Sequence, residues 1–166
     1  KEPTGQVPNI SEEGRASRDN NLYGAAKNGD VVKVVELAGE GASVDVKGEM
    51  GDKEPAVVEA AGRGDWLVVF ALVALDCNIN ATDTLGRTAL MKAASSGKTK
   101  AVYWLLSKEA LCAARDPDLD GTCQFALEVD AVDFEGFTAL MWAALYGHAD
   151  VVGQLLEGGA DRTLRA

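Results

Sequence analysis

The sequence predicts an all-α helical repeat solenoid of about four repeats, with short β-hairpin loops and a long insertion before the last repeat. Three observations predict it: a motif that recurs almost unchanged, glycines that mark one point of each repeat, and paired apolar segments with helical spacing. The 166 residues are 47% hydrophobic and 25% charged, an ordinary composition for a globular protein. We therefore expect one repeat domain with a continuous core.

The recurring motif is Gly-Arg-Thr-Ala-Leu-Met-Lys-Ala-Ala at residues 86–94, which returns at 136–144 with seven of nine residues unchanged. Weaker copies surround the alanine pairs Ala25-Ala26 and Ala60-Ala61. A marker glycine follows each copy, at positions 29, 64, 97 and 147, so the separations are 35, 33 and 50. The last gap is one period plus an insertion of 17 residues.

Each repeat is expected to contain two short helices. The alanine pair lies in the first helix, which ends at the marker glycine because glycine tolerates a positive φ angle. Apolar pairs at helical spacing then indicate a second helix, as in Val151-Val152 with Leu155-Leu156. A single unit cannot bury its own apolar face, so stacking of the units must supply the core.

At these residues the chain resembles the ankyrin-repeat family. The family pattern of an Asp-x-x-Gly-x-Thr-Pro-Leu-His start, an Ala-Ala helix, a Gly-His step and a Leu-Leu-x-x-Gly-Ala-Asp end is matched by Asp133 to Asp161 and by Asp83 to Leu106. The period is also close to the roughly 33 residues of such repeats. The resemblance implies an L-shaped stack of helix pairs, with projecting hairpin loops and a concave face that binds other proteins.

Two positions depart from the family pattern. Alanine replaces the family's proline at Ala89 and Ala139, and methionine replaces its histidine at Met91 and Met141. The hydrogen bonds that this histidine makes in the family therefore cannot be assumed here.

The domain boundaries follow from the repeat. Residues 1–19 are expected to form an extended tail, and residues 20–166 the repeat domain. We hypothesise that the tail crosses the apolar side of the second helices through Val7 and Ile10, or that a partner holds both the tail and this side. Its repeats are expected at about 20–47, 50–82, 83–115 and 133–166, with an inserted finger at 116–132. The finger has strand-like alternation, and a hairpin there would place Cys112 opposite Cys123 as an alternative to reduced thiols.

Composition excludes several function classes. The net charge of −10 disfavours nucleic acid and anionic lipid and favours a protein partner with a basic face. The longest apolar run, Trp66 to Leu75, is shorter than the roughly 20 residues that span a bilayer. Neither a cofactor nor a structural metal is predicted, because the three cysteines do not form a Cys-x-x-Cys pair. The default location is intracellular and cytoplasmic; a processed end at Lys1 would favour an organelle.

Four features resemble functional motifs and have simpler interpretations. Residues 95–99 resemble the end of a phosphate-binding loop, but Lys92 stands where the first glycine is required, so a turn between helices is expected. Asp116, Asp118 and Asp120 resemble the start of a calcium loop whose twelfth position is a leucine. The single histidine, His148, has no nucleophile partner and is interpreted as structural, and the three tryptophans as core residues. No catalytic residue is predicted.

Binding residues are expected where the stack does not need the side chain. The candidate partner-binding residues lie in the loops and first helices of the last two repeats: Leu85, Arg87, Phe134, Glu135, Phe137, Leu145 and Tyr146. Alternatively, the insertion covers this aromatic face. A secondary apolar patch is expected on the second helices: Val32, Val35, Leu67, Phe70, Leu75 and Tyr103.

The leading functional hypothesis is a non-enzymatic adaptor that binds a protein through repeat loops and first-helix surfaces. The alternative is a constitutive subunit of a large, organellar or other, assembly in which both apolar faces are permanently covered. A calcium-responsive module is a third reading, which depends on Asp116, Asp118 and Asp120.

Overall fold

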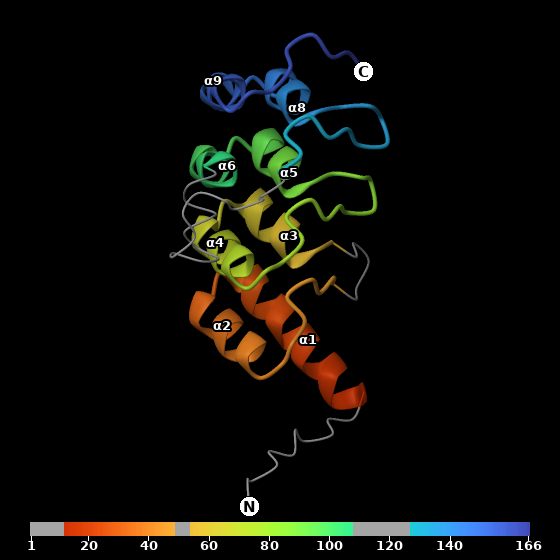
Figure 1. Ribbon diagram of the computed structural model, residues 1–166, viewed down its shortest axis with the longest axis vertical. Coiled ribbons are helices and arrows are strands. Elements are labelled where there is room, and N and C mark those ends of the chain that lie inside the picture. Colours follow the sequence, from red (N-terminus) through yellow and green to blue (C-terminus); the bar gives the residue numbers. More distant parts are fainter. Residues whose placement is uncertain (1–11, 49–53, 108–126) are drawn as a thin grey trace, which may run out of the picture.

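The computed structural model describes residues 12–48, 54–107 and 127–166, and these contain eight helices in four consecutive pairs (Figure 1). The pairs are α1 (Glu12–Asn28) with α2 (Val31–Gly39), α3 (Ala56–Arg63) with α4 (Trp66–Ala74), α5 (Ala89–Ser95) with α6 (Thr99–Leu106), and α8 (Ala139–Leu145) with α9 (Ala149–Glu157). Helices α1, α3, α5 and α8 stack into an inner layer, and α2, α4, α6 and α9 into an outer layer. The predicted all-α solenoid of about four repeats is confirmed.

The marker glycines end the first helices as predicted. Gly29, Gly64, Gly97 and Gly147 all have positive φ angles, between 65° and 86°. An L-residue with a side chain is strained in this conformation, which explains why each repeat returns to glycine at the same point.

The threonines of the recurring motif cap the N-termini of α5 and α8. The hydroxyl oxygens of Thr88 and Thr138 accept hydrogen bonds from the backbone N–H of Met91 and Met141, each at 3.3 Å. The Met141 thioether sulfur in turn accepts from the Thr138 backbone N–H at 3.5 Å. Methionine thus gives this helix start a weak reciprocal bond where the family pattern has histidine.

The core lies between the two layers and runs without interruption through all four pairs. Small alanines on the first helices let these helices approach closely, and branched side chains from both layers fill the space between them. Fully buried members include Leu22, Leu72, Leu90, Leu105 and Leu155. Truncating one such leucine to alanine would lower stability by about 2–5 kcal/mol.

The N-terminal boundary of the domain differs from the prediction. Helix α1 begins at Glu12, so residues 12–19, which were expected to be extended, are helical. This segment lacks apolar periodicity, but it continues a helix whose later turns are anchored in the core by Leu22 and Ala26. Asp19 also accepts the Ser43 backbone N–H at 2.7 Å, and Arg18 donates to the Glu40 carbonyl at 2.8 Å.

Extended pairing in the loops is minimal. Within the described residues the expected hairpins are reduced to two isolated antiparallel bridges, Lys47 with Pro55 and Thr82 with Thr88. The loops before α5 and α8 nevertheless project to the same side of the stack (Figure 1).

Side-chain oxygens connect each loop to the next one along the stack. The bonds are from the Asn78 N–H to Asp45 (2.7 Å), from the Glu128 N–H to Asn80 (3.0 Å) and from the Asp161 N–H to Asp130 (2.9 Å). The second of these shows that the chain has rejoined the repeat frame by Glu128. The end of the segment 116–132, expected to belong to the finger, is therefore part of the stack, and Leu127 and Val129 pack against the core.

Several sequence predictions concern residues outside the described part of the chain. These are the tail contacts of Val7 and Ile10, the pairing of Cys112 with Cys123, and the carboxylates of the calcium-loop look-alike. Across residues 12–48, 54–107 and 127–166, no helix is both long and apolar enough to cross a membrane.

Candidate functional site

The loop before α8 is organised by the buried carboxylate of Asp133. Its Oδ1 accepts the backbone N–H groups of Glu135 at 3.0 Å and Phe137 at 2.9 Å, which closes the loop tip. Its Oδ2 accepts the indole N–H of Trp142 at 2.8 Å. One carboxylate therefore fixes the loop and also orients a tryptophan on the inner face of α8.

The equivalent loop before α5 has an aspartate at the same position, Asp83, but its second oxygen has a different partner. Asp83 Oδ1 accepts the N–H groups of Leu85 and Arg87, both at 2.9 Å, while its Oδ2 pairs with the Arg87 guanidinium at 2.8 Å. Burial raises the pKa of Asp83, but the hydrogen bonds from Arg87 and Leu85 outweigh it and hold that pKa below its ordinary value. Phe137 occupies the Arg87 position in the last repeat, which leaves the second oxygen of Asp133 free for Trp142.

Trp142 is the centre of a row of stacked rings, which we call the aromatic row: Phe137, Trp142, Tyr146 and His148. The ring centroids of Phe137 and Trp142 are 5.0 Å apart, those of Trp142 and Tyr146 are 5.8 Å apart, and those of Tyr146 and His148 are 6.4 Å apart. Tyr146 is 58% exposed and the other three rings are half-buried. The row presents a preorganised aromatic surface to solvent.

Further exposed apolar side chains lie at the loop tips and at the end of α8. Phe134 is 79% exposed, Leu145 61% and Leu85 54%. The two loops are joined, because the Phe134 backbone N–H donates to the Leu85 carbonyl at 3.1 Å. A Cβ atom on Gly86 would lie 2.8 Å from the Phe134 ring, so this ring rests on the neighbouring loop although most of it faces solvent.

His148 has the structural position that the sequence predicted. Its Nε2 lies 3.1 Å from the Ser95 carbonyl oxygen, and its ring packs so closely on Gly97 that a Cβ there would be 2.7 Å from Nδ1. The imidazole thus bridges the last two repeats. The look-alike phosphate loop containing Ser95 and Gly97 is the turn between α5 and α6, as expected.

Helix α5, in the preceding repeat, carries a charged side chain where α8 carries an aromatic ring. Lys92, which stands at the Trp142 position of the preceding repeat, has its ammonium 3.0 Å from Oε1 of the buried Glu54. The contact is an ion pair and not a well-directed hydrogen bond. Burial raises the pKa of the Glu54 carboxyl; Lys92 opposes this rise in part, and the Glu59 carboxylate adds to it.

The structure links four of the candidate partner-binding residues. Phe137 and Tyr146 both stack on Trp142, and the Phe134 backbone N–H donates to the Leu85 carbonyl. Glu135 and Leu145 are exposed, as are Phe134, Leu85 and Tyr146. Arg87 differs, because it is half-buried and its guanidinium is already paired with Asp83.

The prediction that the tryptophans belong to the core is wrong for Trp66 and Trp104, whereas Trp142 packs against the edge of the core. Trp66, Trp104 and Trp142 are all only half-buried. Trp66 and Trp104 stack with centroids 5.1 Å apart and planes 5° apart, and Phe70 contacts Trp104 edge-on at 5.5 Å. Flat stacking covers one face of each indole and leaves the edges accessible.

The secondary apolar patch lies on the outer layer, and its residues divide into two groups. Val32 (68%), Leu67 (51%) and Tyr103 (58%) are well exposed, as is Val35. Phe70 and Leu75, which were also expected to be exposed, are half-buried, because Phe70 packs on Trp104 and Leu75 packs on the core.

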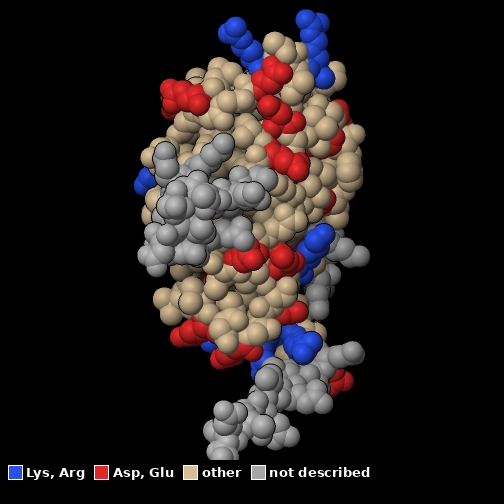
Figure 2. All heavy atoms as spheres, viewed as in Figure 1, with Lys and Arg blue, Asp and Glu red and all other residues tan. Residues whose placement is uncertain are grey.

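Acidic side chains are spread along the whole visible face, and basic ones project at the C-terminal end and at a few places along the stack (Figure 2). Within the described ranges, no group of three or more His, Cys, Asp or Glu residues is placed to hold a metal ion.

Comparison with known proteins gives consistent matches. A family described as ankyrin repeats (3 copies) matches residues 22–116 and 59–166. Probable E3 ubiquitin-protein ligase XBOS33 of Oryza sativa subsp. japonica is 31% identical over 165 residues, covering 84% of this chain and 31% of that protein. Ankyrin repeat and SAM domain-containing protein 6 of Rattus norvegicus is 33% identical over 115 residues, covering 69% of this chain and 11% of that protein.

A third relative is Palmitoyltransferase AKR1 of Lachancea kluyveri, 34% identical over 94 residues, which cover 57% of this chain and 10% of that protein. The chain thus spans about a third or less of the length of each of these relatives.

Proposed function

The chain belongs to the ankyrin-repeat family, and from this premise we propose that it is a non-enzymatic adaptor that binds a partner protein through the aromatic face of its last repeat. The face consists of the aromatic row with Phe134 and Leu145. The observation that carries the proposal is the bond from Trp142 to Asp133, which holds an aromatic surface in place before any partner arrives.

The composition of this face supports protein binding. Aromatic side chains supply large contact areas with few rotatable bonds, and they are enriched among the residues that dominate interface energetics. Phe134 and Tyr146 expose more than half of their surface. Covering them would release water from apolar area, while the net charge of −10 favours a partner with a basic face.

The test is capture of partners from a native extract with three immobilised proteins. One is the unaltered chain, one carries Phe134→Ala, Phe137→Ala and Tyr146→Ala, and one carries Val32→Ala and Val35→Ala on the outer layer as a matched control. Circular dichroism first establishes that all three melt alike. A protein captured by the first and third but not by the second supports the proposal; identical capture by all three contradicts it.

The second candidate function is a constitutive subunit of a large assembly. It is favoured by the exposed Val32, Leu67 and Tyr103 on helices of the outer layer, because two uncovered apolar faces suit a permanently buried protein. Sedimentation of the purified chain distinguishes the two. An adaptor is expected to be monomeric and stable alone, whereas a subunit deprived of its neighbours is expected to aggregate.

A further inference from the structure

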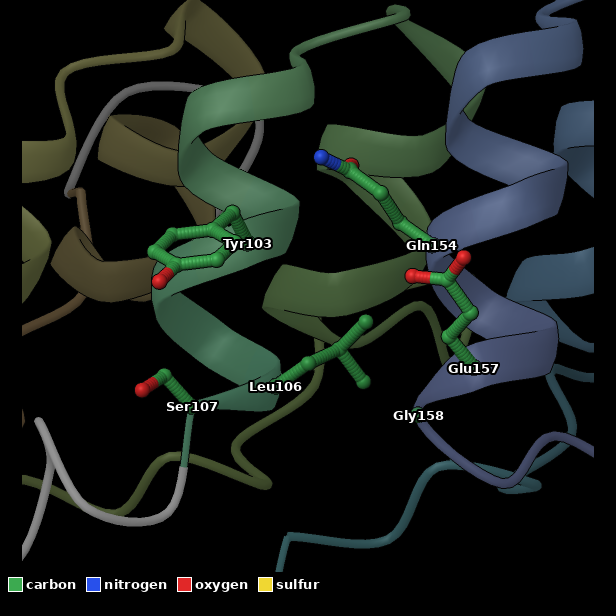
Figure 3. Close-up of a pocket in the computed structure, with 6 residues that line it drawn as sticks. All are labelled: Tyr103, Leu106, Ser107, Gln154, Glu157 and Gly158. Carbon is green, nitrogen blue, oxygen red and sulfur yellow. The ribbon is translucent and has the colours of Figure 1, made fainter.

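A groove lies between α6 and α9 on the outer layer, and none of the residues that line it belongs to the aromatic row (Figure 3). It has a volume of about 220 Å³ and is lined by Tyr103, Leu106, Ser107, Gln154, Glu157 and Gly158. Small-molecule sites usually enclose roughly 300–1,000 Å³, so this groove is matched to one long side chain and not to a cofactor.

The floor of the groove is apolar. Leu106 extends from the end of α6 towards α9 (Figure 3), and a Cβ atom on Gly158 would lie 2.8 Å from its Cδ2. The missing side chain at Gly158 therefore allows the end of α9 to rest on Leu106. An aliphatic stem laid along this floor would lose water on one side.

The α9 side of the groove carries two hydrogen-bond acceptors. In Figure 3 the Gln154 side chain extends from α9 towards α6, and the Glu157 side chain runs along α9 with one carboxylate oxygen on the α6 side. The Gln154 Oε1 is buried and has no hydrogen-bond partner in the described part of the chain. Among the same residues no Lys or Arg pairs with Glu157, and the lining contains no basic side chain.

An unpaired buried acceptor beside an unpaired carboxylate calls for a ligand that brings several donors and a positive charge. A guanidinium has five N–H donors in a plane and a three-carbon stem, so it can bind the exposed Glu157 carboxylate while its stem covers Leu106. It reaches Gln154 Oε1 when the half-buried amide turns towards the groove. The surplus of acidic residues in the chain favours the approach of such a group.

We propose that the groove between α6 and α9 binds one arginine side chain of a protein partner, with the guanidinium on Glu157 and Gln154. This contact is separate from the aromatic face and does not depend on the function proposed above. The outer layer would then carry a recognition site of its own, in addition to the aromatic face.

The experiment is an NMR titration of the full, ¹⁵N-labelled chain with the peptide acetyl-Gly-Arg-Gly-amide. We expect saturable shifts of the backbone signals of Leu106, Ser107 and Gln154, weakened by added salt. The matched probe replaces arginine by citrulline, which keeps the shape and removes the charge, and it is expected to bind at least about threefold more weakly.

Two variants and one control locate the contact. Glu157→Gln should raise the Kd of the arginine peptide by about threefold or more. Gln154→Leu should also weaken binding without loss of folding, because it removes an acceptor that has no partner. Asp150→Asn removes the same charge seven residues earlier on the same side of α9 and should leave the Kd unchanged.

Several results would overturn the proposal. Equal binding of the citrulline peptide, an unchanged Kd in Glu157→Gln, or the absence of shifts at the groove would each remove the site. Equal binding of acetyl-Gly-Lys-Gly-amide would overturn the assignment to arginine. Shifts that appear only in a Lys108→Gln/Arg115→Gln variant would mean that the chain itself fills the groove, which rules out a partner there.

Discussion

The indole nitrogen of Trp142 lies 2.8 Å from Oδ2 of Asp133, and this bond joins the last loop to the inner face of α8. The same carboxylate binds two backbone N–H groups of the loop through Oδ1. A change at either residue therefore affects the shape of the loop and the direction of the aromatic row together.

Replacing Trp142 with phenylalanine keeps an aromatic ring but leaves Oδ2 of the buried Asp133 without its donor. We expect the free energy of unfolding to fall by about 1–3 kcal/mol, as measured by urea denaturation. Trp104→Phe is the matched control, since the ring contacts found for Trp104 can be made by phenylalanine. Equal losses in the two variants would contradict the role given to the indole N–H.

Asp83 should make stability depend on acid pH. Its folded-state pKa lies below the ordinary value of 3.8, so its contribution is complete above pH 3.8 and is lost as the pH falls through the lowered value. Asp83→Asn should be less stable at neutral pH by about 1–2 kcal/mol, and the difference should shrink below pH 3.8. Urea midpoints at several pH values measure this. A difference that stayed constant with pH would argue against it.

Glu54 should give stability the opposite pH dependence to Asp83. Its folded-state pKa is raised above 4.5, so the folded protein holds the proton more tightly and loses stability as the pH rises through the raised value. Glu54→Gln, which is neutral at every pH, should therefore melt higher than the unaltered chain at pH 7.5 but not at pH 4. Glu40→Gln at an exposed position is the control. A lower melting temperature at pH 7.5 would show that the ion pair with Lys92 outweighs burial.

Gly86 supports the Phe134 ring and has a φ angle of 78°. Gly86→Ala should destabilise the protein by about 1–3 kcal/mol and displace Phe134, which reduces partner binding as well. Gly24→Ala is the matched control, because Gly24 lies inside α1 and a Cβ there meets nothing within 4 Å. That control should gain about 0.5–1 kcal/mol. Thermal melts of both variants test the contrast.

The repeat made the helix pairs and their ends predictable, because the marker glycines and alanine pairs recur in a fixed frame. The start of α1 was missed, since its first turns show no apolar periodicity. The stack of Trp66 on Trp104 was also missed, because the two residues occupy different frame positions and meet only when neighbouring helices pack.

The bond between Asp133 and Trp142 did leave a signal in the sequence. Phe137 stands where the preceding repeat has Arg87, so Asp133 keeps its place but loses its charged partner. A buried carboxylate requires another donor. Trp142 supplies it, at the position that Lys92 occupies in the preceding repeat. Reading these exchanges together would have located the centre of the aromatic row.

The loop-to-loop hydrogen bonds also determine which mutations the chain can tolerate over evolutionary time. Each bond takes its oxygen from a side chain, Asp45, Asn80 or Asp130, and its hydrogen from a main-chain amide. The amide is the same in every residue except proline, so these three bonds place no demand on the donor side chains, although Asn78 and Asp161 also accept the Asn80 and Thr163 backbone N–H groups. As far as these loop-to-loop bonds are concerned, the limit on substitution therefore lies with the residues that supply the oxygen, Asp45, Asn80 and Asp130.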